Sequence, residues 1–68
     1  MPLTPADHDL IALIRDGHAN RMIAHRMQLS TIAVSDLLAK LYRKLDATDR
    51  AGAIAAAARL AADGEVRP

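Results

Sequence analysis

Three segments of this chain repeat apolar residues every three to four positions, which is the spacing of one face of an α-helix. These segments are residues 5–16, 20–27 and 31–45, and a fourth, residues 50–63, is rich in the strong helix former alanine. The spacing predicts buried faces made of Leu10, Ile11, Leu13 and Ile14, then Ile23, Ala24 and Met27, then Val34, Leu37, Leu38, Leu41 and Leu45. We therefore expect an all-α fold of four helices with no strand.

Residues that begin or end helices stand at the boundaries of these segments. Thr4 precedes Pro5 at the first helical position, and Asp7 follows three residues later in a capping-box arrangement. Gly17 is suited to end the first helix. The other predicted N-caps are Asn20, Ser30 and either Thr48 or Asp49. We expect one domain over residues 1–68, with a frayed tail at 64–68.

The composition excludes several classes of protein. With 68 residues and no cysteine, the chain has room for one small core and no disulfide framework. The single tyrosine, with no tryptophan or phenylalanine, argues against stacking of single-stranded bases on aromatic side chains. The longest apolar run, within residues 53–58, is far shorter than the roughly 20 residues of a membrane span. No signal peptide is visible either, so we expect a cytoplasmic protein that does not enter a membrane.

Charge is distributed unevenly along the chain. Residues 18–44 hold five basic residues against one acid, Asp36, whereas the two flanks hold four basic and seven acidic residues. A basic centre between acidic ends favours an anionic partner for the middle of the chain. A solvated helix surface without any partner is the alternative reading of the same charges.

Two consecutive helical segments, "NRMIAHRM" and "STIAVSDLLAKLYRK", are joined by about three residues. A short support helix, a tight turn and a longer second helix form the helix-turn-helix plan, in which the second helix enters the major groove of DNA. A plain helical bundle would show the same apolar stripes and remains the alternative on pattern alone.

The chain also resembles the LuxR/GerE-type helix-turn-helix domain over residues 3–58. "LTPADHDLIALIRDG" stands where the family has L-T-x-R-E-x-E-V-L-x-L-x-x-x-G, and "ANRMIAHRMQLS" stands where it has S-N-K-E-I-A-x-x-L-x-I-S. Val34, "LYRKL" and "DRAGAIAAA" follow at the offsets of the family. The resemblance implies a four-helix domain that binds double-stranded DNA in transcriptional regulation. We expect sequence-specific or semi-specific binding. An initiating Met and the absence of a tag favour a stand-alone domain, and an excised piece of a longer protein is the alternative.

The resemblance also implies which residues meet DNA. The positions expected to bind phosphates are Asn20, Arg21, Lys40, Arg43, Lys44 and Arg50. The positions expected to face the bases are Ile32, Ser35, Asp36 and Ala39. Here the chain departs from the T-V-K-x-H-V pattern of the family, because small, apolar and acidic residues replace basic ones and Leu37 stands in place of the usual His. The alternative is that Ile32, Ala33 and Leu37 form an apolar surface that docks on a transcription factor or a polymerase subunit.

The last helix is expected to form a homodimer, as the resemblance implies. One face of this helix carries Ile54, Ala58 and Ala61, or alternatively Ala57 and Leu60. Small side chains there would let two helices approach closely. Dimerisation would place two DNA-reading helices about one DNA turn, ~34 Å, apart. The alternative is that Ile54 and Leu60 close the core of the monomer.

Catalysis is not expected. His8, His18 and His25 show no zinc-ligand spacing, and Gly17, Gly52 and Gly64 stand too far apart for a phosphate-binding loop. The carboxylates Asp46 and Asp49 suit the capping of a helix better than acid–base chemistry. We therefore expect no enzyme activity, no metal and no cofactor.

Overall fold

The structure is a computed structural model that describes residues 3–61. This part of the chain forms α1 (Pro5–Arg15), α2 (Asn20–Met27), α3 (Thr31–Lys44) and α4 (Arg50–Leu60), and contains no strand. The all-α, four-helix fold expected from the sequence is thereby confirmed. The first and third helices end one residue before the predicted ends at 16 and 45. The end predicted for the fourth helix at 63, and the tail at 64–68, lie outside the described residues.

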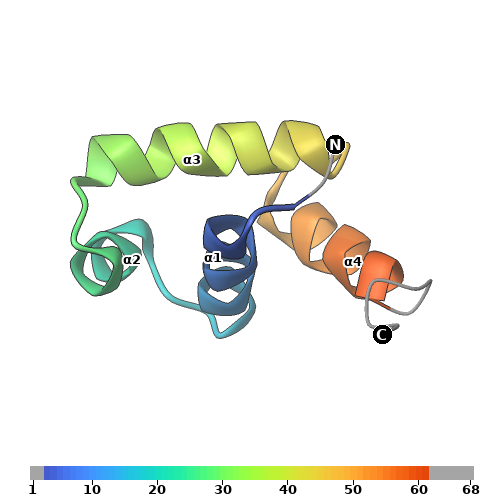
Figure 1. Ribbon diagram of the computed structural model, residues 1–68, viewed down its shortest axis with the longest axis horizontal. Helices are drawn as coiled ribbons and strands as arrows, with labels where there is room; N and C mark the ends of the chain where they lie inside the picture. The colour runs from blue at the N-terminus through green and yellow to red at the C-terminus, as the bar shows by residue number, and fades with distance from the viewer. Residues whose placement is uncertain (1–2, 62–68) are drawn as a thin grey trace.

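Helix α3 lies across the other three helices (Figure 1). Helix α2 lies below its N-terminal end, α1 below its middle, and α4 below its C-terminal end (Figure 1). The N-terminal half of α3 is therefore held by α2, and its C-terminal half is held by α4 and by the first turn of α1.

The core is built from the apolar stripes of all four helices. Its members are Leu10, Ile11, Ile14, Ile23, Ala24, Val34, Leu38, Leu41, Leu45, Ala53 and Ala56. Full burial of a Leu, Ile or Val side chain contributes roughly 1.5–3 kcal/mol, so these residues dominate the stability of the domain. Leu13, Met27 and Leu37, which the spacing also placed inside, are half-buried and pack against the edge of the core.

Helix α4 contributes only alanines to the buried core, Ala53 and Ala56. Because these side chains are small, the backbone of α4 can approach its neighbours closely.

Side-chain caps begin three of the helices. The Thr4 hydroxyl accepts a hydrogen bond from the Asp7 backbone N–H at 3.1 Å, and the Asp7 carboxylate accepts one from the Thr4 N–H at 2.9 Å, which completes a capping box. Ser30 and Asp49 cap α3 and α4 in the same local manner, at 3.0 and 2.7 Å. Gly17 ends α1 with a φ of +86°, in the left-handed region that suits glycine.

The predicted N-cap at Asn20 is wrong. Ala19 occupies the cap position of α2, and no side chain caps this helix. Asn20 is instead the first helical residue, and its side chain makes a tertiary hydrogen bond described below. The start of α2 therefore keeps backbone N–H groups that no side chain satisfies.

Candidate nucleic-acid interface

Helices α2 and α3 form a closely packed pair joined by a tight turn. Gln28 ends α2 in a left-handed conformation with φ 58° and ψ 45°, and the Leu29 N–H donates to the Ala24 carbonyl at 2.9 Å. Ile23 of α2 and Val34 of α3 are both completely buried between the helices and the core. This packing gives α3 a rigid support, which a helix that reads DNA requires.

The four residues predicted to face the bases share one exposed face of α3. Ser35, Asp36 and Ala39 are exposed, and Ile32 keeps 75% of its surface open to solvent. The opposite face of the helix is the buried stripe that includes Val34. The four side chains are therefore presented together, away from the core.

Three of the predicted phosphate-binding cations are exposed. Arg21 in the first turn of α2, and Lys40 and Arg43 on α3, form no hydrogen bond or ion pair with any residue that the structure describes. Arg26 of α2 is similarly exposed, although the family pattern did not single it out. The general basic character of residues 18–44 was the only signal for it in the sequence.

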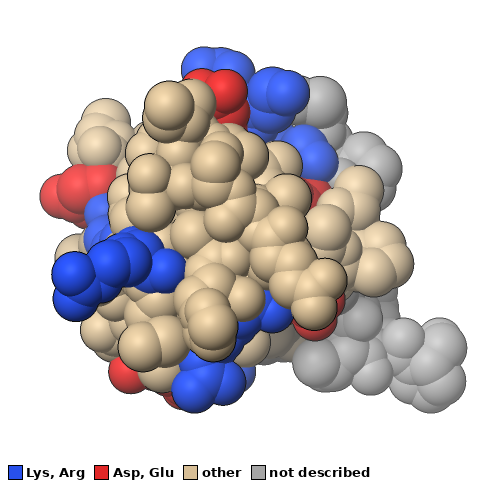
Figure 2. Space-filling view, turned by 90° about the vertical axis from the view of Figure 1, so that its left-hand side faces the viewer, with Lys and Arg blue, Asp and Glu red and all other residues tan. Residues whose placement is uncertain are grey.

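The side of the molecule that carries α2 and the start of α3 has an uncharged centre. Figure 2 shows this side as a broad surface of uncharged residues, with Lys and Arg side chains around it and Asp or Glu side chains between them. The rim therefore carries both signs of charge. Phosphates would meet it where Lys and Arg stand.

Lys44 lies in a different environment from Lys40 and Arg43. Its Nζ atom donates a hydrogen bond to Asp7 Oδ2 at 2.6 Å, and the exposed fractions of the two side chains are 20% and 12%. This ion pair joins the first turn of α1 to the last turn of α3. Lys44 thus holds the fold together, and its charge is largely neutralised before any phosphate approaches.

The Asp7 carboxylate is electrostatically stabilised by this arrangement. Burial alone raises the pKa of Asp7, but the hydrogen bonds from Lys44 and Thr4 and the positive charge of Lys44 outweigh it. The net result is a pKa below the ordinary value of 3.8.

Arg50 also has partners inside the domain. Its Nη1 atom donates to the His18 carbonyl at 2.6 Å, and its Nη2 atom donates to Asn20 Oδ1 at 2.7 Å. The first residue of α4 is thereby fastened to the loop before α2 and to the start of α2. Asn20 and Arg50, both predicted to bind phosphate, are thus hydrogen-bonded to each other, and Arg50 also to the His18 carbonyl. Only their remaining N–H groups can face DNA.

The apolar surface differs in composition from the one predicted. Ala33 and Leu37 are half-buried, so they add little to a docking surface beside Ile32. Two other apolar residues are exposed instead, Met22 of α2 at 43% and Leu29 of the turn at 40%. Neither was singled out in the sequence, because Met22 belongs to a helical segment whose other apolar residues point inward and Leu29 stands in the turn between two helices.

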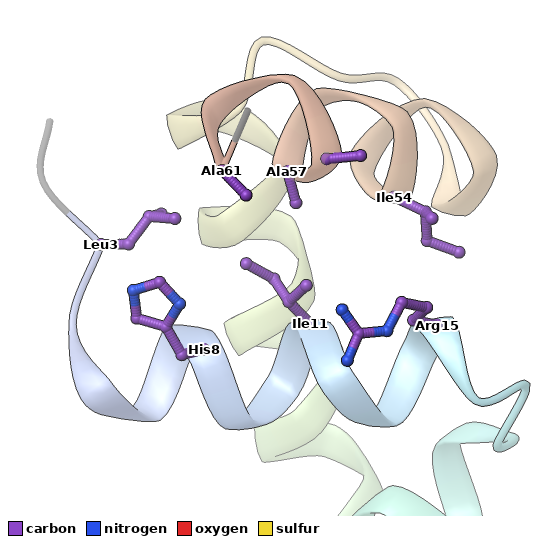
Figure 3. A pocket seen from close by; sticks show the side chains of 8 residues that line it. Leu3, His8, Ile11, Arg15, Ile54, Ala57 and Ala61 are labelled. Carbon is purple, nitrogen blue, oxygen red and sulfur yellow. The ribbon is translucent and has the colours of Figure 1, made fainter. Parts of the chain in front are cut away.

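A hollow of about 330 Å³ lies between α1 and α4, beside the place where the two helices pack together. Figure 3 shows Ile54 and Ala57 of α4, and Ala61 directly after it, pointing toward α1 across this hollow. The full lining is Leu3, His8, Ile11, Arg15, Ile54, Ala57, Ala58 and Ala61. All three residues predicted for the dimer contact therefore border one depression, which the polar residues His8 and Arg15 also line. In it Ala58 is exposed, and Ile54 and Ala61 are half-buried.

Within residues 3–61, no group of three or more potential ligands is placed so that it could hold a metal ion. None of the helices in this range is long and apolar enough to cross a membrane.

Comparison with known proteins identifies the family. The model of the GerE family, described as bacterial regulatory proteins of the luxR family, matches residues 1–57. No curated protein and no solved structure gives a significant match. The match covers α1, α2, α3 and most of α4, including the whole of the α2–α3 pair. The chain therefore belongs to the LuxR family of bacterial regulatory proteins, DNA-binding regulators of transcription built on an all-α helix-turn-helix.

Proposed function

We propose that this protein binds double-stranded DNA with sequence preference, as a homodimer in the cytoplasm, to regulate transcription. The observation that carries the proposal is the outer surface of the α2–α3 pair. An exposed face of α3 from Ile32 to Ala39 is continued by Lys40 and Arg43, and Arg21 stands exposed on α2. Because these three cations have no partner among the described residues, they can meet phosphates without breaking any internal contact.

The start of α2 supports the same proposal. No side chain caps this helix, and Arg21 lies in its first turn. Uncapped backbone N–H groups and the positive end of the helix dipole favour a phosphate oxygen at this position. Phosphate contacts of this kind give affinity and orientation, whereas the exposed face of α3 supplies the base contacts.

A salt titration tests DNA binding directly. The affinity of the chain for a random-sequence duplex is measured by fluorescence anisotropy from low to moderate salt. Each phosphate contact contributes about −0.9 to the slope of log K against log salt concentration. We expect Lys40→Gln and Arg21→Gln each to reduce the slope by about 0.9. Arg59→Gln is the matched control, since Arg59 is an exposed cation of α4 that does not border the α1–α4 hollow.

Lack of binding to any duplex at low salt would contradict the proposal. A slope that changes equally in Arg59→Gln and Lys40→Gln would mean that only the net charge of the protein matters. The helical content of each variant, measured by circular dichroism, shows whether the fold is kept.

The second candidate is a domain that docks on a transcription factor or a polymerase subunit. The exposed apolar residues Met22, Leu29 and Ile32 of the α2–α3 pair favour it, since exposed apolar surface on a small domain can mark a partner site. In that case Met22→Ser and Ile32→Ser would abolish capture of the partner, and the duplex affinity of the two variants would equal that of the wild type.

A further inference from the structure

The exposed face of α3 changes its chemistry along the helix. From Ile32 to Ala39 this face carries Ile32, Ser35, Asp36 and Ala39, without any cation, and Lys40 and Arg43 begin only after it. In helix-turn-helix proteins the N-terminal residues of the second helix contact base edges. The part of α3 that would meet the bases therefore offers one large apolar group, one carboxylate and two small side chains.

The carboxylate of Asp36 restricts which base it can meet. Asp36 is exposed, and no hydrogen bond or ion pair to it occurs within residues 3–61. A carboxylate only accepts hydrogen bonds, so it is repelled by the acceptors of guanine and by O4 of thymine in the major groove. The groove offers two donors, the N6 amine of adenine and the N4 amine of cytosine. The adenine amine lies beside the acceptor N7, whereas no acceptor adjoins the cytosine amine on its own edge, which makes cytosine the better partner.

Ile32 is the most exposed large apolar residue in the described chain, with 75% of its surface open. The apolar group that the major groove displays is the C5 methyl of thymine. Ile32 and Asp36 are four residues apart, so they lie on the same side of α3 about 6 Å apart along its axis. That separation matches about two base-pair steps of ~3.4 Å each. Both side chains can therefore contact bases of the same half-site.

We propose that Asp36 accepts a hydrogen bond from a cytosine N4 amine while Ile32 packs on a thymine methyl within about two base pairs of it. The small side chains of Ser35 and Ala39 allow the helix to approach the bases closely at these positions. This inference rests on the DNA binding proposed above and names the chemistry of the preferred site.

Selection of bound duplexes from a random pool tests the role of Asp36. The full chain and its Asp36→Asn variant are each used to select duplexes, and the selected sites are sequenced. An asparagine donates to adenine N7 and accepts from adenine N6, so we expect the preference at one position to change from C·G to A·T. The size of this change should be about tenfold in relative affinity per half-site.

Asp46→Asn is the matched control. Asp46 is an exposed acid in the turn after α3, and its φ of 54° is one that asparagine also tolerates. The Asp46→Asn substitution removes the same negative charge as Asp36→Asn and leaves the exposed face of α3 unchanged. Its selected sites should be those of the wild type.

Removal of single methyl groups from the DNA tests the role of Ile32. Replacing the selected thymine by deoxyuridine deletes only its C5 methyl, and we expect the wild type to bind this duplex about fourfold more weakly. Ile32→Ala should bind the two duplexes equally, because the partner of the methyl group has already been removed. Deoxyuridine at a thymine outside the selected site should have no effect on either protein.

Three results would overturn the inference. One is an unchanged site preference in Asp36→Asn, and another is equal sensitivity of wild type and Ile32→Ala to the missing methyl. Both leave DNA binding itself intact, so they contradict only the assignment of bases. Selection of no duplex by the wild type at low salt would overturn the assignment and the proposed function together.

Discussion

The Nζ atom of Lys44 lies 2.6 Å from Oδ2 of Asp7, and this ion pair ties the end of α3 to the start of α1. The same carboxylate oxygen accepts a hydrogen bond from the Thr4 N–H at 2.9 Å. Asp7 therefore takes part both in a local capping box and in a contact with a residue 37 positions away in the sequence. The end of α3 is thereby held in place independently of any DNA. The cation nearest the end of α3 is structural, whereas Lys40 on the same helix faces solvent.

Replacing Lys44 by methionine should destabilise the domain. The change leaves the carboxylate of Asp7 largely buried without its charged partner, which costs about 1–2 kcal/mol, since hydrogen bonds to charged groups are worth more than neutral ones. Urea unfolding at pH 7 measures the loss. Lys40→Met is the control, because an exposed substitution on the same helix stays within about ±0.5 kcal/mol. Equal stability of the two variants would contradict a structural role for Lys44.

The stability of the domain should also depend on pH through Asp7. Its folded-state pKa lies below the ordinary value of 3.8, so the native state holds the ionised form more strongly than the unfolded chain does. The contribution of Asp7 to the free energy of unfolding is therefore fully present above its unfolded-state pKa. This contribution is lost as the pH falls through the folded-state pKa. Unfolding of wild type and Asp7→Asn between about pH 6 and about pH 2 should show a difference that shrinks with acidity. A constant difference would exclude Asp7 as the group responsible.

Removing the charge of Arg50 and removing that of Arg43 should have different effects on the stability of the domain and on its DNA binding. Arg50→Gln removes the donors to the His18 carbonyl and Asn20 Oδ1, which should cost about 1–2 kcal/mol of stability, with little change in the salt slope of DNA binding. Arg43→Gln should instead keep the stability and reduce that slope by about 0.9. Urea unfolding and the salt titration together separate the two roles. A reduced slope in both variants, with unchanged stability, would make Arg50 a phosphate-binding residue.

The α4 dimer can be tested at Ala58. Ala58→Glu places a charge in the hollow between α1 and α4, where a second copy would bring the same charge close by two-fold symmetry. Sedimentation analysis should show a dimer dissociation constant at least about tenfold higher than that of the wild type. Ala55→Glu is the control, since Ala55 is exposed on α4 and does not border the hollow. A wild type that is monomeric at all concentrations would contradict the proposed dimer.

Local sequence determined most of the secondary structure. The caps at Thr4, Ser30 and Asp49 each join residues three apart, and the apolar stripes follow from helical geometry, so both are visible without any knowledge of tertiary contacts. The exposed face of α3 follows in the same way, because the residues opposite a buried stripe must face outward.

Only the tertiary structure decided which charged residues remain available for a partner. Lys44 and Arg50 look like Lys40 and Arg43 in the sequence, yet their partners lie 30 to 37 residues away. The sequence predicted Asn20 as a helix cap, but the position of α4 brings Arg50 close enough to donate a hydrogen bond to the side-chain oxygen of Asn20. These outcomes depend on how the helices cross and on which side chains then meet. The sequence by itself determined the helices and their faces, and the packing of those helices determined which cations are left for DNA.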